Sequence, residues 1–102
     1  MTHFSFLNDT FILSGKLTIY KVTEIRKILI QTLATEQKNK NFYLDLENIE
    51  FIDSAMLQLL ISLKVTITEN NGHLFVKKSN QHFDSLLEIF ALPADTFPKV
   101  SL

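Results

Sequence analysis

The chain has 102 residues, a net charge of −1, no cysteine and two glycines, Gly15 and Gly72. This length fits a single domain over residues 1–102, and the composition excludes disulfides, thiolate metal sites and glycine-rich phosphate loops. Because there is no basic excess, we do not expect the protein to bind nucleic acid. Because there is no apolar run of roughly 18 residues and no signal-peptide pattern, we expect a cytoplasmic protein that does not insert directly into a membrane.

The beginning of the chain predicts a hairpin of two short strands. Apolar residues at positions 4, 6 and 11–13 lie on either side of Asn8 and Asp9, which are residues typical of turns. Gly15 is expected to break the second strand.

A helix and a strand are expected next. Thr18 is the expected N-cap of a helix in which apolar residues recur at positions 22, 25, 29 and 33. Residues 42–46 are aromatic-rich and apolar, which predicts a buried strand, with Glu47 and Glu50 in the turn after it.

The second half of the chain predicts two further helices around a short strand at 73–76. One helix begins just after Asp53 and ends at Asn70–Gly72 with a left-handed residue. Ser79 or Asn80 caps the last helix, which Leu92–Pro93 stops. The inward face of the first of these helices comprises Met56, Leu59, Leu60, Leu63 and Ile67, and that of the second comprises Phe83, Leu86, Leu87 and Phe90.

The predicted order of elements is β-β-α-β-α-β-α. Such alternation favours a single-domain α/β fold with a mixed sheet of about four to five strands and helices packed on it. Right-handed crossovers make the strands at 42–46 and 73–76 parallel. A last strand in the tail after residue 97 stays open.

The sequence gives little support for catalysis. His3, His73 and His82 lack the spacing of zinc ligands, so we expect no metal site and no cofactor. Ser54, His82 and Asp53 can be written as a hydrolase triad, but the serine lacks the G-x-S-x-G context. The carboxylates between 45 and 53 are better explained as solvated loop charges, and we therefore expect no enzyme.

The pair Asp53–Ser54 at a helix start is more informative. One interpretation is a helix cap worth about 1 kcal/mol. In the other, Ser54 is an exposed hydroxyl at a helix N-terminus, where free N–H groups and the helix dipole favour a phosphate. Phosphorylation would place about two negative charges beside Asp53 and repel an acidic partner surface.

Three segments resemble the STAS family, named for sulfate transporters and anti-sigma factor antagonists. The longest is the run 43–60, which contains Tyr43–Leu46, Ile49–Ala55 and Leu57–Leu60; Gly15–Thr18 and Asn71–Leu74 resemble two family turns. The resemblance implies a stand-alone regulator that binds a partner kinase, often an anti-sigma factor, until Ser54 is phosphorylated. It places the partner surface at Thr18, Asp53, Ser54, Met56, Gln58 and, more weakly, Asn80.

The chain departs from the family pattern at Met56, where many members have glycine, and near Thr18, where antagonists carry an acidic residue. Met56 is expected either to hinder a kinase or to offer an exposed apolar contact. Other segments resemble STAS proteins linked to chemotaxis (18–20 and 57–60) and STAS subunits of lipid-transport ABC complexes (92–95). The alternative function is therefore a constitutive subunit of such a complex, and a homodimer through Met56 and Phe97 stays open.

Overall fold

Strands and helices alternate in the order that the sequence predicts. The computed structural model describes residues 4–93 and 95–100. The elements in chain order are β1 (Phe4–Leu7), β2 (Thr10–Leu17), α1 (Ile19–Ala34), β3 (Phe42–Ile52), α2 (Ser54–Glu69), β4 (Leu74–Lys78) and α3 (Gln81–Ile89). His3 and Ala94 lie outside the described residues.

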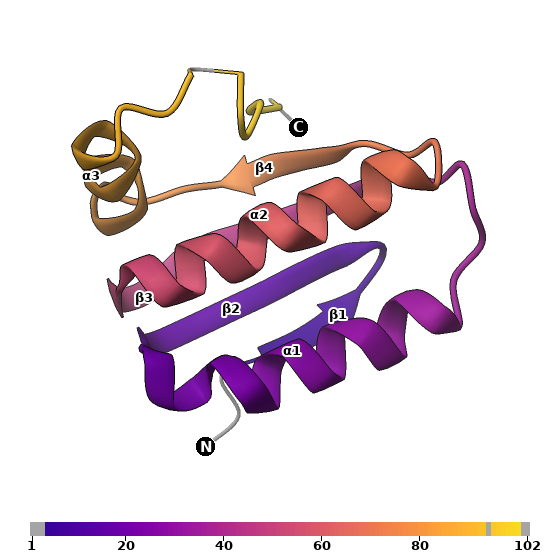
Figure 1. Cartoon of the computed structure of the whole chain (residues 1–102), viewed down its shortest axis with the longest axis horizontal. Coiled ribbons are helices and arrows are strands. Elements are labelled where there is room, and N and C mark those ends of the chain that lie inside the picture. The colour runs from indigo at the N-terminus through magenta and orange to yellow at the C-terminus, as the bar shows by residue number, and fades with distance from the viewer. Residues whose placement is uncertain (1–3, 94, 101–102) are drawn as a thin grey trace.

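The sheet is mixed, as predicted. Within the described part of the chain it has four strands in the order β1-β2-β3-β4 (Figure 1). β1 pairs antiparallel with β2, whereas β2 with β3 and β3 with β4 are parallel. The two crossovers through α1 and α2 make these pairs parallel, because a connection through a helix returns the chain to the same end of the sheet.

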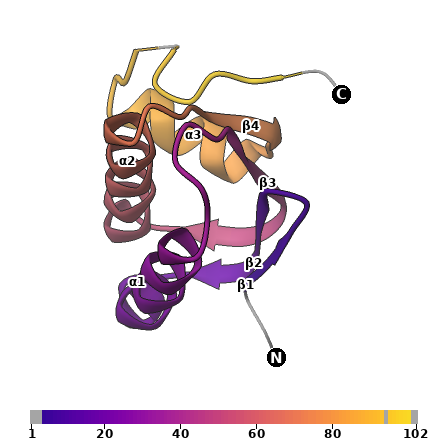
Figure 2. The same cartoon turned by 90° about the vertical axis from the view of Figure 1, so that its right-hand side faces the viewer.

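The helices α1 and α2 lie next to each other against one face of the sheet (Figure 2). Between the layers lies a core of fully buried side chains, among them Phe11, Leu44, Leu60 and Val76. α1, α2 and α3 each begin within three residues of the end of β2, β3 or β4. The N-termini of these helices therefore share one edge of the sheet with the carboxyl ends of the parallel strands.

Left-handed residues define two of the predicted boundaries. Asn8 and Asp9 have φ of 50° and 61°, which confirms the predicted turn between β1 and β2. Asn71 has φ of 64°, and the Gly72 amide donates to the Ile67 carbonyl at 2.9 Å, which confirms the predicted end of α2. Gly72 lies so close to the Lys40 carbonyl that an added Cβ would be 2.1 Å from its oxygen.

Two predicted strand ends are wrong. β2 continues through Gly15, which has φ of 79° and lies beside a shift in register, so the glycine bends the strand without breaking it. β3 extends to Ile52 and includes Glu47 and Glu50, which were expected in a turn. The extension follows from pairing with β2, which continues as far as Leu17 opposite Ile52.

The chain after α3 folds back onto the core. α3 ends at Ile89, before Leu92–Pro93, and Phe90 is exposed and not part of the inward face. Phe97 is buried and its ring contacts that of Phe83 with centroids 5.4 Å apart, so it is not available for a homodimer. A single parallel bridge joins Val76 and Lys99. In the described part of the chain, no helix has the length and apolar character needed to cross a membrane.

Candidate functional site

Asp53 joins two helices and two strands at the edge of the sheet where the helices begin. Its Oδ1 accepts a hydrogen bond from the Met56 amide at 3.1 Å, which is the expected cap of α2. Its Oδ2 accepts from the Ile19 amide of α1 at 2.7 Å. Its own amide donates to the Leu17 carbonyl at the end of β2 at 3.1 Å. One side chain therefore holds the starts of both α1 and α2.

Thr18 occupies the N-cap position of α1, but its hydroxyl makes no capping hydrogen bond. The predicted N-cap position is thus confirmed, but a side-chain cap by Thr18 is not present, and Asp53 instead accepts from the amide of Ile19, the first residue of the helix. The Thr18 carbonyl accepts from the Lys21 amide at 2.9 Å, a bond over three residues that is frequent at helix N-termini. Thr18 thus lies at the same edge as Asp53, and its hydroxyl makes no capping hydrogen bond within the described part of the chain.

Ser54 is the first residue of α2 and its side chain is exposed. Its hydroxyl makes no hydrogen bond with the described residues. The first N–H groups of a helix lack carbonyl partners within it, and together with the helix dipole they favour a negative group at this end. Gln58, one turn further along α2, is also exposed and lies on the same face of the helix as Ser54.

Asn80 connects α3 to β3. Its Oδ1 accepts from the Phe83 amide at 3.2 Å, so it is the residue that caps α3. Its Nδ2 donates to the Ile49 carbonyl at 2.8 Å and lies 3.4 Å from the Glu47 carbonyl oxygen. Thr18, Asp53 and Asn80 are thus the N-cap residues of the three helices that begin at this edge.

Met56 does not belong to the surface. Its side chain is fully buried beneath the start of α2. The expectation that it hinders a partner or forms an exposed apolar contact is wrong, because its position on the inward face of the helix turns it into the core. For the same reason Met56 cannot support a homodimer.

A groove runs beside Ser54 and has a volume of about 580 Å³. It lies between the end of β3, the start of α2 and one side of α3. Three of its side chains are large, apolar and exposed: Phe51 by 48%, Ile89 by 74% and Phe90 by 49%. Ile19 and Tyr20, exposed by 60% and 92%, lie at the start of α1, which Asp53 holds against α2.

These apolar side chains are the part of the site that the sequence did not predict. Phe51 had one usable signal, because strand alternation turns it away from the buried Ile52. Ile89 and Phe90 had none, because their exposure depends on where α3 ends and how the following chain turns at Ala91, which has φ of 50°.

The residues of the hypothetical triad share this groove but are not connected. Asp53, Ser54 and His82 all line it, yet no hydrogen bond joins any two of these side chains. Both carboxylate oxygens of Asp53 accept from backbone amides instead, whereas a catalytic triad needs the acid to orient the histidine. Over residues 4–93 and 95–100, no three His, Asp or Glu side chains are grouped so that they could hold a metal ion.

The chain is similar to proteins of known name and to proteins of known structure. Over 78 residues the chain is 27% identical to the anti-sigma-B factor antagonist of Staphylococcus aureus, with the same figures for strains NCTC 8325 / PS 47 and COL; the match covers 76% of this chain and 70% of the relative. The crystal structure of TM1081 from Thermotoga maritima, a candidate anti-sigma factor antagonist, matches with a TM-score of 0.70 at 20% identity and covers 97% of this chain and 86% of that one. The NMR structure of TM1081 matches with a TM-score of 0.74 at 20% identity and covers 99% and 81%.

The likeness to TM1081 confirms the fold, and the relatives from Staphylococcus aureus carry the name anti-sigma-B factor antagonist. The family described as "Mlab, STAS domain" matches residues 5–95, which include all of β2 to α3, all of β1 except Phe4, and the whole edge around Ser54. This chain therefore belongs to the STAS domain family.

Proposed function

We propose that the chain is a non-catalytic, cytoplasmic regulatory module that binds a protein partner through the surface around Ser54, and that phosphorylation of Ser54 releases this partner. One observation carries the proposal: Ser54 is exposed at the start of α2, beside Asp53 and at the border of a groove with exposed apolar side chains. The names of the relatives support a partner of the anti-sigma factor class, with serine kinase activity as the family resemblance implies.

Binding would use the apolar side chains of the groove as anchors. Aromatic residues are enriched in the buried centres of interfaces, and charged residues are depleted there. Phe51 and Phe90 are suited to this role, because each is about half exposed in the free chain. A partner that covers them removes their apolar surface from water, which favours binding. Thr18, Gln58 and Asn80 would form the polar surroundings of this contact.

Release would follow from the charge of the phosphate. The added group carries about two negative charges near neutral pH. It would stand next to the carboxylate of Asp53, which cannot turn away without losing its bonds to the Ile19 and Met56 amides. A partner that covers the groove would have to remove water from both negative groups, and this desolvation disfavours the complex.

The kinase step has a direct test. The chain is incubated with ATP and the anti-sigma factor kinase encoded in the same genome, and phosphate is mapped by mass spectrometry. We expect a single modified site at Ser54 and none in Ser54→Ala. Phosphate at another residue only, such as the exposed Ser85, would contradict the proposal.

A second candidate is a constitutive subunit contact, as in a lipid-transport ABC complex. The observation that favours it is the apolar character of the groove, because permanent interfaces are more hydrophobic than transient ones. In that case the partner would bind Ser54→Asp and the unchanged chain equally well. Neighbouring genes separate the candidates cheaply: a kinase or chemotaxis cluster supports the switch, and transporter genes support the subunit.

A further inference from the structure

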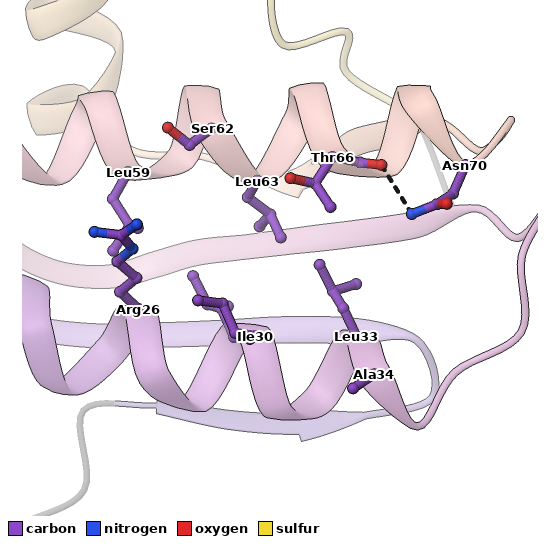
Figure 3. Close-up of a pocket in the computed structure, with 10 residues that line it drawn as sticks. Arg26, Ile30, Leu33, Ala34, Leu59, Ser62, Leu63, Thr66 and Asn70 are labelled. Atoms are coloured by element: carbon purple, nitrogen blue, oxygen red, sulfur yellow. Dashed lines mark hydrogen bonds between the residues drawn. The ribbon is translucent and has the colours of Figure 1, made fainter.

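A second concave surface lies between α1 and α2, on residues that the Ser54 groove does not share. It has a volume of about 370 Å³. Its floor consists of Leu29, Leu59 and Leu63, which are buried, and Leu33 from α1 faces Leu63 from α2 across it (Figure 3). The surface is thus an apolar trough along the seam of the two helices.

One charged side chain stands in this trough. Among the described residues that line it, Arg26 alone carries a charge, and Figure 3 shows its guanidinium reaching from α1 toward Leu59 of α2. Arg26 makes no ion pair or hydrogen bond with any residue in the described part of the chain. At the other end, the Asn70 side chain donates to the Thr66 carbonyl at 3.1 Å and limits the trough.

An unpaired guanidinium above an apolar floor selects a particular kind of ligand. The planar group of arginine binds a carboxylate through two parallel hydrogen bonds, and the leucine floor favours an aliphatic chain. We propose that the trough binds a small amphipathic monocarboxylate, with its carboxylate at Arg26 and its chain along Leu33 and Leu63.

The size and charge of the trough argue against larger occupants. Its volume lies near the lower end of the range of about 300–1,000 Å³ that small-molecule pockets occupy. A helix of a partner protein is about 10 Å across with its side chains, so a volume of about 370 Å³ would hold only a few of its side chains. A second copy of this chain would present the same face, and no carboxylate lines it among the described residues.

The test is a titration of the full chain with three probes that share a ten-carbon alkyl chain, the two ionic ones kept below their micelle concentrations and the alcohol below its solubility limit. The probes are sodium decanoate, 1-decanol and decyltrimethylammonium. Binding of each probe is measured from the shifts of backbone amide signals in NMR spectra. We expect decanoate to shift the signals of Arg26, Leu33 and Leu63 and to bind most tightly of the three. From octanoate to decanoate, each added methylene is expected to strengthen binding by up to about fourfold.

Two substitutions isolate the guanidinium. Arg26→Gln is expected to weaken decanoate binding roughly tenfold and to leave 1-decanol unchanged, because an arginine–carboxylate contact is lost only for the acid. Lys27→Gln removes the same charge from the neighbouring exposed residue, which does not line the trough, and is expected to bind like the unchanged chain. Melting curves establish that both variants fold.

Three results would overturn the inference. They are equal affinities for decanoate and 1-decanol, equal losses in Arg26→Gln and Lys27→Gln, and shifts confined to the groove at Phe51 and Ile89. A fourth titration uses an acidic amphipathic peptide. If this peptide shifts the signals of the trough residues more strongly than decanoate does, the occupant is a helix of a partner protein, and the proposal of a small ligand is also overturned.

Discussion

The carboxylate of Asp53 lies 2.7 Å from the backbone nitrogen of Ile19, 34 residues away along the chain. The same side chain caps its own helix through the Met56 amide. The start of α1 and the start of α2 are therefore joined by one residue, and Ser54 is the next residue along. The edge at which we place partner binding is held together by the residue beside the proposed phosphorylation site.

This arrangement predicts unequal effects at two capping positions. Asp53→Ala removes the acceptor of two helix N-termini and is expected to lower the free energy of unfolding by about 2 kcal/mol, because one such cap contributes about 1 kcal/mol. Thr18→Ala is expected to change it by less than about 0.5 kcal/mol, because its hydroxyl caps nothing. Urea unfolding measures both, and equal effects would contradict the bridging role of Asp53.

Substitutions of Met56 are predicted to change the stability of the fold and not the affinity for the partner. Met56→Ala leaves a cavity in the core and is expected to lower the free energy of unfolding by about 2–5 kcal/mol. Met56→Leu preserves the volume and is expected to cost less than about 1.5 kcal/mol and to leave partner affinity unchanged. An affinity that falls in Met56→Leu while the melting temperature stays constant would show that this side chain contacts the partner.

Gly72 is required by a close approach of the backbone. In Gly72→Ala the new Cβ would lie 2.1 Å from the Lys40 carbonyl oxygen, so α2 and the chain before β3 would have to separate. We expect a loss of at least about 2 kcal/mol in the free energy of unfolding. The control is Asn71→Gly at φ of 64°, where glycine fits without strain and stability should be kept. Equal stability of Gly72→Ala and the unchanged chain would contradict this packing.

The ion pairs of Lys40 are predicted to make the stability of the fold decrease at high pH. Its ammonium contacts Asp9 at 2.9 Å and Glu36 at 3.0 Å, and these hydrogen bonds raise the pKa of Lys40 above its usual value. A raised pKa in the folded state means that the contribution is complete below the unfolded pKa of about 10.4 and is lost as the pH rises through the folded pKa. The Lys40 side chain keeps 33% of its surface exposed, and solvent screens its ion pairs, so the effect should be small.

The measurement for Lys40 is the difference in melting temperature between the unchanged chain and Lys40→Gln as a function of pH. The unchanged chain should be the more stable one at pH 7, and the difference should shrink above about pH 10.4. A difference that grows with pH in this range would contradict the assignment.

Local signals in the sequence predicted much of the fold. The turn at Asn8 and Asp9 and the end of α2 at Asn71 depend on a few neighbouring residues with known conformational preferences. The inward face of α2 followed from its helical period, which also placed Met56 in the core. The family resemblance counted the same residue in the partner surface, and the burial of Met56 shows that the period was the better guide.

Features that depend on distant pairing were not predictable. β3 continues past residue 46 because β2 pairs with it up to Leu17, and the bond from Ile19 to Asp53 exists because that pairing brings two helix starts together. The groove beside Ser54 likewise needs α3 to lie near the end of β3, which Asn80 secures through the Ile49 carbonyl. Sequence patterns locate Ser54, whereas the apolar surface around it appears only in the fold.

The central claim is that the partner leaves when Ser54 becomes negatively charged, and isothermal titration of the purified partner kinase tests it most directly. The unmodified chain is compared with the Ser54-phosphorylated chain, with Ser5→Asp on β1 as a control for an added charge elsewhere on the surface. We predict that phosphorylation weakens binding by roughly tenfold or more and that Ser5→Asp binds like the unmodified chain. Equal affinity of the phosphorylated and unmodified chains would contradict the account.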